Sequence, residues 1–186
     1  MPVAGICGVG LQGDSYPERV KLVVGAVVAY PPHGVGRVAV RESRVVLGAK
    51  QEVVVIELAE GLSVTLPLER AQELLRPVVT EAGLRRVRAT LREDAVLSDE
   101  IWSKRLKQVQ EMLRSGGPEE LAAIVRDGFR RDRASGTPGA GSKLSVSERA
   151  LFLRARELLS GEIGFARGLG QAEADAWIDE QLVALG

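Results

Sequence analysis

The chain has 186 residues, 45% of them hydrophobic, which is enough to form one domain or two small ones with a packed core. Its 25 basic and 25 acidic residues give a formal net charge of zero, which argues against a protein that coats nucleic acid by charge alone. One cysteine and one histidine exclude a disulfide within the chain and a Cys/His metal centre, so we expect no metal and no cofactor.

Residues 1–19 contain four glycines and show neither helix nor strand periodicity, so we predict a flexible leader. Within it, GVGLQG formally matches the G-x-G-x-x-G of dinucleotide-binding folds, but no strand precedes it and no helix opens inside it. We interpret the match as chance. The first residues show neither a basic n-region nor an A-x-A cleavage site, and the chain has no apolar run of roughly 18 residues, so we expect a cytoplasmic protein that does not bind membranes.

From 20 to 75 the chain is rich in valine, in short runs separated by turn residues, which predicts strands. The stretches LGAK and AEG have the length and glycine content of hairpin turns, so neighbouring strands should pair antiparallel. A sheet this small removes its edges best by closing, which predicts a small SH3-like or Tudor-like antiparallel β-barrel. The five predicted strands are VKLVVGAVVAY, GRVAVRE, SRVVL, QEVVVIELA and LSVTLPL.

The loop YPPHGVG contains His33, the one histidine that could act as a base. Catalysis would need a group that orients it or a nucleophile that it activates, and the local sequence supplies neither. We favour a structural role, in which Pro31 and Pro32 stiffen the loop and the glycines let it turn. We therefore expect no catalytic residue and no enzyme activity.

After Pro77 the pattern becomes helical and predicts, over 76–186, a domain of about five helices, so that the fold class is α+β. Ser98 is a candidate N-cap for a helix that runs through Leu113. Pro118 suits the first position of the next helix, and residues 134–143 form a Gly/Ser-rich loop. Ser145 and Glu148 have the spacing of a capping box.

Basic residues concentrate in the middle of the chain, where residues 76–133 carry 13 basic and 10 acidic side chains, net +3. There Trp102 is followed by Lys104, Arg105 and Lys107, and an aromatic wedge beside basic residues is the chemistry that reaches a distorted minor groove. The alternative is a core tryptophan at the edge of an apolar helix stripe. A second basic row, Arg126, Arg130 and Arg133, is typical of a solvated helix face.

The ordered series VVAYPPHGVGRV, SRVVLGAKQEVVVIEL, VTLPLERA, IWSKRLKQVQEMLRSG, IVRDGFRRDR and LSVSERALFLRARELLSGEI resembles the CarD (CdnL-like) family of bacterial transcription regulators. The likeness covers about 20–186. It implies an N-terminal barrel, related to the polymerase-interacting domain of the transcription-repair coupling factor, that binds the β subunit of RNA polymerase. It also implies a helical domain that contacts promoter DNA at the upstream edge of the transcription bubble.

The resemblance assigns roles to individual residues. Arg44, a strand arginine that on local sequence alone is an ordinary solvated side chain, would contact polymerase. Some members carry an Arg-x-Pro pattern at the end of the barrel; Thr65 stands in place of that arginine here, so we expect an altered contact. Trp102 would be the wedge, with sequence-tolerant contacts to the minor groove and backbone. The expected phosphate contacts are Lys104, Arg105, Lys107, Arg131 and Arg149.

The expected function is therefore a transcription regulator that stabilises the open complex as a monomer, associated with the nucleoid through polymerase and without a small-molecule substrate. The alternative is a protein-interaction adaptor that binds polymerase or another partner without touching DNA. An enzyme is the weakest alternative, since no paired carboxylates, phosphate loop or nucleophile motif can be assembled from local sequence.

Overall fold

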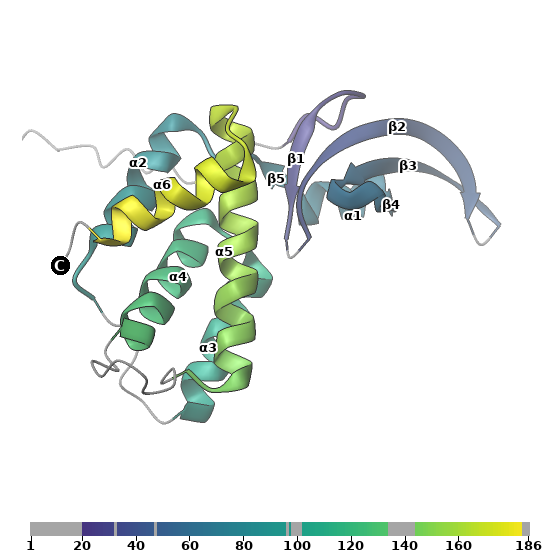
Figure 1. Ribbon diagram of the computed structural model, residues 1–186. Coiled ribbons are helices and arrows are strands. Elements are labelled where there is room, and N and C mark those ends of the chain that lie inside the picture. The colour runs from purple at the N-terminus through teal and green to yellow at the C-terminus, as the bar shows by residue number, and fades with distance from the viewer. Residues whose placement is uncertain are drawn as a thin grey trace, which may run out of the picture.

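The computed structural model describes residues 20–31, 33–46, 48–95, 97, 102–133 and 144–183. An antiparallel sheet comes first and a bundle of helices follows, as Figure 1 shows, which confirms the expected α+β fold class. The strands are β1 (Val27–Tyr30), β2 (Gly34–Val46), β3 (Ala49–Leu58), β4 (Ser63–Pro67) and β5 (Arg76–Pro77). The helical elements are η1 (Ala59–Gly61), α1 (Leu68–Leu74), α2 (Glu81–Arg92), α3 (Trp102–Ser115), α4 (Pro118–Arg133), α5 (Val146–Arg167) and α6 (Gln171–Val183).

The sheet is open, where the sequence predicted a closed barrel. Its strand order is β4-β3-β2-β1-β5, and each neighbouring pair is antiparallel. The edge strands β4 and β5 have five and two residues, whereas β2 has thirteen. Figure 1 shows the β2–β3 hairpin curving away from the helices, beyond the reach of strands this short. Closure would need longer edges.

Three details of the sheet differ from the predicted strands. Of VKLVVGAVVAY, only the last four residues form a strand, β1. GRVAVRE and SRVVL form one continuous strand, β2, whose register shifts only between Val38 and Val40. The last strand lies at Arg76–Pro77, so the sheet reaches two residues beyond position 75, where the sequence divides the chain. The helix α1 was not predicted, and it packs against β3 and β4.

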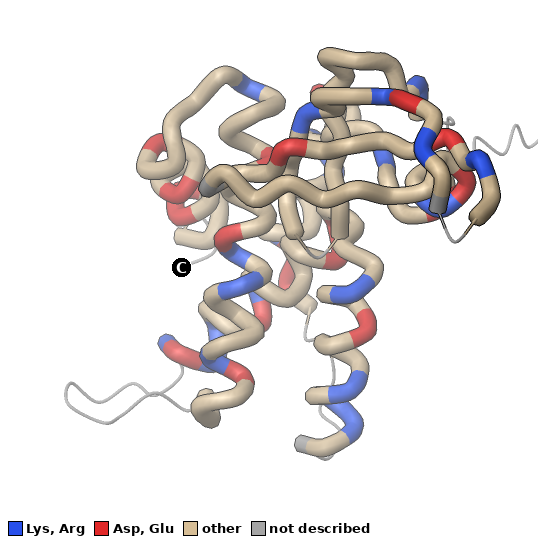
Figure 2. The backbone as a smooth tube through the Cα atoms, turned by 90° about the vertical axis from the view of Figure 1, so that its right-hand side faces the viewer, with Lys and Arg blue, Asp and Glu red and all other residues tan. Residues whose placement is uncertain are grey.

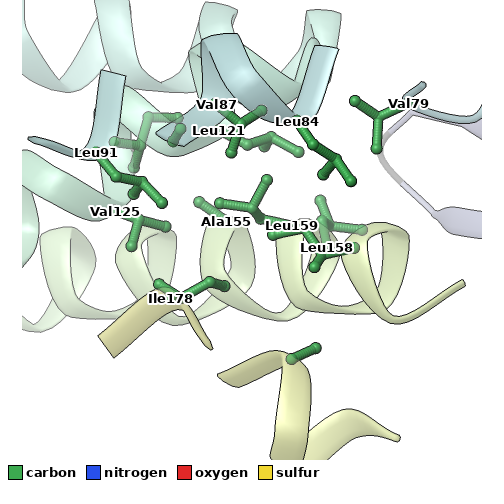
Figure 3. Packing of buried hydrophobic residues seen from close by; sticks show 14 of the residues in the cluster. Val79, Leu84, Val87, Leu91, Leu121, Val125, Ala155, Leu158, Leu159 and Ile178 are labelled. Atoms are coloured by element: carbon green, nitrogen blue, oxygen red, sulfur yellow. The ribbon is translucent and has the colours of Figure 1, made fainter. Parts of the chain in front are cut away.

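Each half of the molecule has its own apolar core. One cluster lies between the inner face of the sheet and α1, and it includes Val28, Val38, Val54 and Ile56. The other fills the helical bundle, where Figure 3 shows the side chains of α2, α4, α5 and α6 pointing toward one another. On α2 the contributing residues follow the i, i+3, i+7 spacing of an amphipathic helix: Leu84, Val87 and Leu91.

Two predicted helix starts are confirmed. Pro118 is the first residue of α4, and α5 opens with a complete capping box between Ser145 and Glu148. Residues 1–19, the Ser98 cap and the loop 134–143 lie outside the described residues. Among the described helices, none combines the length and apolar character that a membrane crossing requires.

Two of the three arginines in the row on α4 bind other parts of the protein and are not solvated as we expected, while Arg133 is exposed. Arg126 is only 3% exposed, and its Nη1 donates to the carbonyl of Thr90 at 3.0 Å and to Glu93 Oε2 at 2.8 Å. Arg130 donates to the carbonyl of Glu93 at 2.9 Å. These guanidinium groups donate to carbonyls at the C-terminal end of α2, a favourable position for positive charge, and the Thr90 carbonyl also accepts from the Glu93 N–H.

Candidate functional site

Arg44 and Thr65 share the outer face of the sheet. Arg44 pairs with Gln51, and Thr65 pairs with Val55, two positions four residues apart on β3. Alternate residues of a strand point to opposite faces, so Gln51 and Val55 lie on one side and the buried Val54 on the other. Arg44 and Thr65 are both exposed, and about 13 Å separates their positions along β3.

The Arg44 side chain is 53% exposed and is held by an acidic neighbour on the same face. Its Nε donates to Glu42 Oε1 at 2.6 Å. An ion pair this exposed is worth little, because water competes for both charges. A carboxylate of a partner protein can therefore replace Glu42 at small cost.

Two further features of the sheet suit a protein partner. The strand β4 pairs with β3 on one side only, among the described residues, so its other edge presents backbone donors and acceptors for an added strand. A shallow hollow of about 380 Å³ lies between the hairpin and the start of α1, next to the cross-strand partner of Arg44. It is lined by Lys50, Gln51, Glu52, Pro67, Leu68 and Glu69.

At the other end of the molecule, Glu148 binds α3 to the start of α5. Its Oε2 accepts from the backbone N–H and the Oγ of Ser145, at 2.9 and 2.8 Å. Its Oε1 accepts from Arg105 Nη2 at 2.9 Å, and the two side chains are 14% and 15% exposed. Burial alone would raise the pKa of the Glu148 carboxyl, but the hydrogen bonds from Ser145 and Arg105 outweigh it and hold the pKa below its usual range.

The residues expected to contact phosphates differ in exposure. Lys104, Lys107 and Arg149 are exposed, and the contact between Arg105 and Glu148 brings the first turns of α3 and α5 together. Figure 2 shows the helical ends that point away from the sheet, which carry both basic and acidic residues. Arg105 is engaged by Glu148, as Arg131 is by Asp127 at 2.8 Å. Trp102 is the first residue of α3, and its side chain lies outside the described part of the chain.

An ion pair between a partly buried arginine and a buried carboxylate joins the sheet to the helical bundle. Arg76, on β5, donates from Nη1 to Glu162 Oε1 at 2.5 Å and from Nη2 to Glu162 Oε2 at 2.7 Å. Glu162 lies on α5, 3% exposed. The same carboxylate accepts from the backbone N–H of Val79 at 2.8 Å, and Arg76 Nη2 also donates to the carbonyl of Gly116 at 2.6 Å. One charged pair therefore links β5 to α5 and to the turn between α3 and α4.

The loop that contains His33 forms a second part of this junction. Gly116 has a φ of +62°, and a Cβ atom on it would lie 2.5 Å from Cβ of Pro31. The loop is closed by a hydrogen bond from the His33 N–H to the Tyr30 carbonyl, and the two rings lie 4.9 Å apart. The close approach of Pro31 to Gly116 shows that this loop packs the sheet against the helices.

Local sequence gave no sign of this junction. Arg76 and Glu162 are 86 residues apart in the sequence. An open groove of about 830 Å³ lies beside the junction, between β2 and α5, with Leu58, Leu158 and Phe165 among its walls. The described residues contain no group of three or more His, Cys, Asp or Glu side chains that could hold a metal ion.

Comparison with known proteins adds to this geometry. Residues 22–79 match the model of the CarD-like/TRCF RID domain, and residues 86–179 match that of the CarD C-terminal domain. A Bacillus subtilis (strain 168) protein named "Putative transcription factor YdeB" is 25% identical over 154 residues, which are 81% of this chain and 95% of that protein. The two family matches follow the order of the sheet and the helical bundle.

Proposed function

Because this chain belongs to the CarD family, and so to proteins associated with transcription, we propose that it regulates initiation by binding RNA polymerase and promoter DNA at once. The sheet binds the polymerase β subunit and the helical domain binds the DNA. The two surfaces are the outer face around Arg44 and the helical end around Lys107 and Arg149. The observation that carries the proposal is the buried Arg76–Glu162 junction, which joins the two surfaces in one body.

The polymerase contact is proposed at Arg44 and Thr65. Both are exposed on one face, next to an open strand edge and a shallow hollow. Arg44 exchanges its weak pair with Glu42 for a carboxylate of the β subunit. Thr65, in the position of the arginine of the Arg-x-Pro pattern, contributes a hydroxyl instead of a charge, so Arg44 carries more of the contact.

The DNA contact is proposed at the first turns of α3 and α5. Lys104, Lys107 and Arg149 are exposed there and meet phosphates without reading sequence. Arg105 and Arg131, which we also expected at phosphates, are bound by acidic neighbours. We assign these two a supporting role, in which they hold α3 and α4 in the orientation that the contact needs.

The junction explains how a chain without net charge acts on DNA. Once the sheet is bound to polymerase, the helical domain meets promoter DNA at a high effective concentration, so a few weak phosphate contacts suffice. Trp102, at the start of α3, inserts at the upstream edge of the bubble, where the base step is unstacked. That contact exists in the open complex only, so it shifts the equilibrium toward melting.

The test measures, by native gel electrophoresis, whether the full chain binds to RNA polymerase and to polymerase–promoter complexes. We expect binding to polymerase alone, and a slower loss of the open complex when the protein is present. If the chain binds polymerase but leaves the open complex unchanged, it is a protein-interaction adaptor that does not contact DNA, which is the alternative function. A chain that does not bind polymerase would contradict the proposal.

A further inference from the structure

Four arginines gather on a side of the helical domain that the proposed function leaves unused. Arg85, Arg88 and Arg92 lie on α2 at positions i, i+3 and i+7, in one row about 10 Å long. Arg167 is the last residue of α5. All four side chains are exposed, and the apolar residues of α2 lie on another face of the helix.

Two of these arginines are positioned by the ring of Trp177, on α6. Cζ of Arg88 lies 5.8 Å from the ring centroid, and Cζ of Arg167 lies 5.6 Å from it. Both distances fall within the range of a cation–π contact, which attracts a guanidinium without removing its charge. The N–H donors of a guanidinium in such a contact can still bind an anion. The ring therefore holds two guanidinium groups in place without neutralising them.

Acidic side chains do not neutralise the cluster. Within the described residues none of its four arginines forms an ion pair, although most other arginines of the helical domain do. The acids of α6 are largely engaged elsewhere: Glu173 accepts from the Gly170 N–H, while Arg156 binds Asp175 and Asp179. The paired arginines of the helical domain are Arg86, Arg105, Arg114, Arg126, Arg130, Arg131, Arg154 and Arg156.

We propose that Arg85, Arg88, Arg92 and Arg167 form a second phosphate-binding surface, which takes the backbone of duplex DNA. This inference rests on the proposed function, because it assumes that the helical domain meets promoter DNA. A straight row of guanidinium forks along an exposed helix suits successive phosphates, each of which accepts two parallel hydrogen bonds. A duplex presents about one charge per 1.7 Å of its axis, so it can reach all four arginines together.

The second surface is separate from the first. Arg149 and Arg167 lie near opposite ends of α5, 18 residues apart, which corresponds to about 27 Å along the helix. A duplex rises about 3.4 Å per base pair, so roughly eight base pairs would run between the two surfaces. The second surface would therefore extend the contact between the helical domain and the duplex, in the direction away from the bubble edge.

The experiment measures the affinity of the full chain for a 30-base-pair duplex as a function of salt concentration. The variant Arg85→Gln/Arg92→Gln removes two charges from the row, keeps good helix formers and leaves the contacts of Trp177 in place. The matched control, Arg70→Gln/Arg114→Gln, removes two exposed arginines that are paired with acids on their own helices. We expect the first variant to lower the slope of log K against log salt by about 1.8, and the control to leave it unchanged.

A third variant, Lys107→Gln/Arg149→Gln, separates this inference from the proposed function. If it lowers the slope while Arg85→Gln/Arg92→Gln behaves like the control, the second surface is wrong and the proposed DNA contact stands. If neither variant differs from the control, at salt concentrations low enough for the unmodified chain to bind the duplex, both fall. Unchanged DNA binding combined with lost binding of polyglutamate would assign the row to an acidic protein partner and overturn the DNA assignment.

Discussion

Arg76 binds both carboxylate oxygens of Glu162 across 86 residues of chain. Glu162 is almost fully buried and also accepts from the backbone of Val79. Breaking such a pair by removing one partner leaves the other charge buried without compensation. The pair lies where the sheet meets the helices, so it determines the orientation of the two proposed binding surfaces as well as the stability of the protein.

Removing the carboxylate should destabilise the whole molecule. We expect Glu162→Ala to lower the free energy of unfolding by about 3–5 kcal/mol, because Arg76 loses its carboxylate partner and keeps only the carbonyls of Gly116 and Pro77, while the Val79 N–H loses its acceptor. Chemical denaturation monitored by circular dichroism gives this value. The control is Glu73→Ala, which removes an acid from an exposed ion pair with Arg70 and should change the free energy by at most about 0.5 kcal/mol. Equal effects of the two substitutions would contradict the role of the junction.

A methyl group at Gly116 should destabilise the protein by disturbing the packing of the sheet against the helices. Gly116→Ala places a Cβ against Pro31 and also adopts a positive φ. Gly168 has a similar φ, +66°, and a Cβ atom on it would have no heavy atom within 4 Å, so Gly168→Ala incurs the backbone cost alone, about 1–2 kcal/mol. We expect Gly116→Ala to cost roughly 1–3 kcal/mol more in thermal or chemical unfolding. Equal losses of stability in the two variants would show that Pro31 moves aside at no cost, which would contradict a tight contact between Pro31 and Gly116.

The contribution of Glu148 to the stability of the protein should depend on pH, in the direction that its lowered pKa sets. Hydrogen bonds lower the pKa of this carboxyl in the folded protein below its ordinary value of 4.5. The charged form therefore stabilises the fold above that value, and the stabilisation is lost as pH falls through the folded pKa. We expect Glu148→Gln to be less stable than the unmodified chain at pH 7, with the difference shrinking below about pH 4.5. Denaturation curves at several pH values measure the difference in stability between the two proteins. A difference that does not change with pH would contradict the stabilising role of the Glu148 carboxylate.

Charge reversal on the outer face of the sheet should weaken the polymerase contact. We expect Arg44→Glu to raise the Kd for the β subunit at least about tenfold, since it sets like charges against each other. The matched control is Arg41→Glu, three residues away and so on the opposite face of β2. Surface-based binding measurements with both variants test this. Equal weakening by both would mean that overall charge, and not the outer face, determines binding.

Local sequence predicted the features that depend on neighbouring residues. The Ser145–Glu148 capping box and Pro118 at the start of α4 follow from backbone groups within one helical turn. The valine-rich runs likewise identified the main strands. The sequence did not predict the helix α1, because this helix has only seven residues and directly follows the strand β4, which ends at Pro67.

The features that the sequence did not reveal are long-range contacts. No local pattern indicates that Arg76 meets Glu162, or that Arg126 enters the core to satisfy carbonyls at the end of α2. Whether Arg105 faces a phosphate or Glu148 is likewise decided by the packing of α3 on α5. The i, i+3, i+7 spacing of Arg85, Arg88 and Arg92 was visible in the sequence, but its significance depends on knowing which arginines have acidic partners.

The most direct test of the central claim is the lifetime of promoter open complexes, measured by stopped-flow fluorescence with bacterial RNA polymerase. We compare the unmodified chain with Trp102→Ala, at the start of α3, and with Arg44→Glu. The account predicts that the unmodified chain lengthens the lifetime, that Trp102→Ala loses this effect while still binding polymerase, and that Arg44→Glu loses both. An unchanged lifetime with the unmodified chain, on several promoters and with the cognate polymerase, would contradict it.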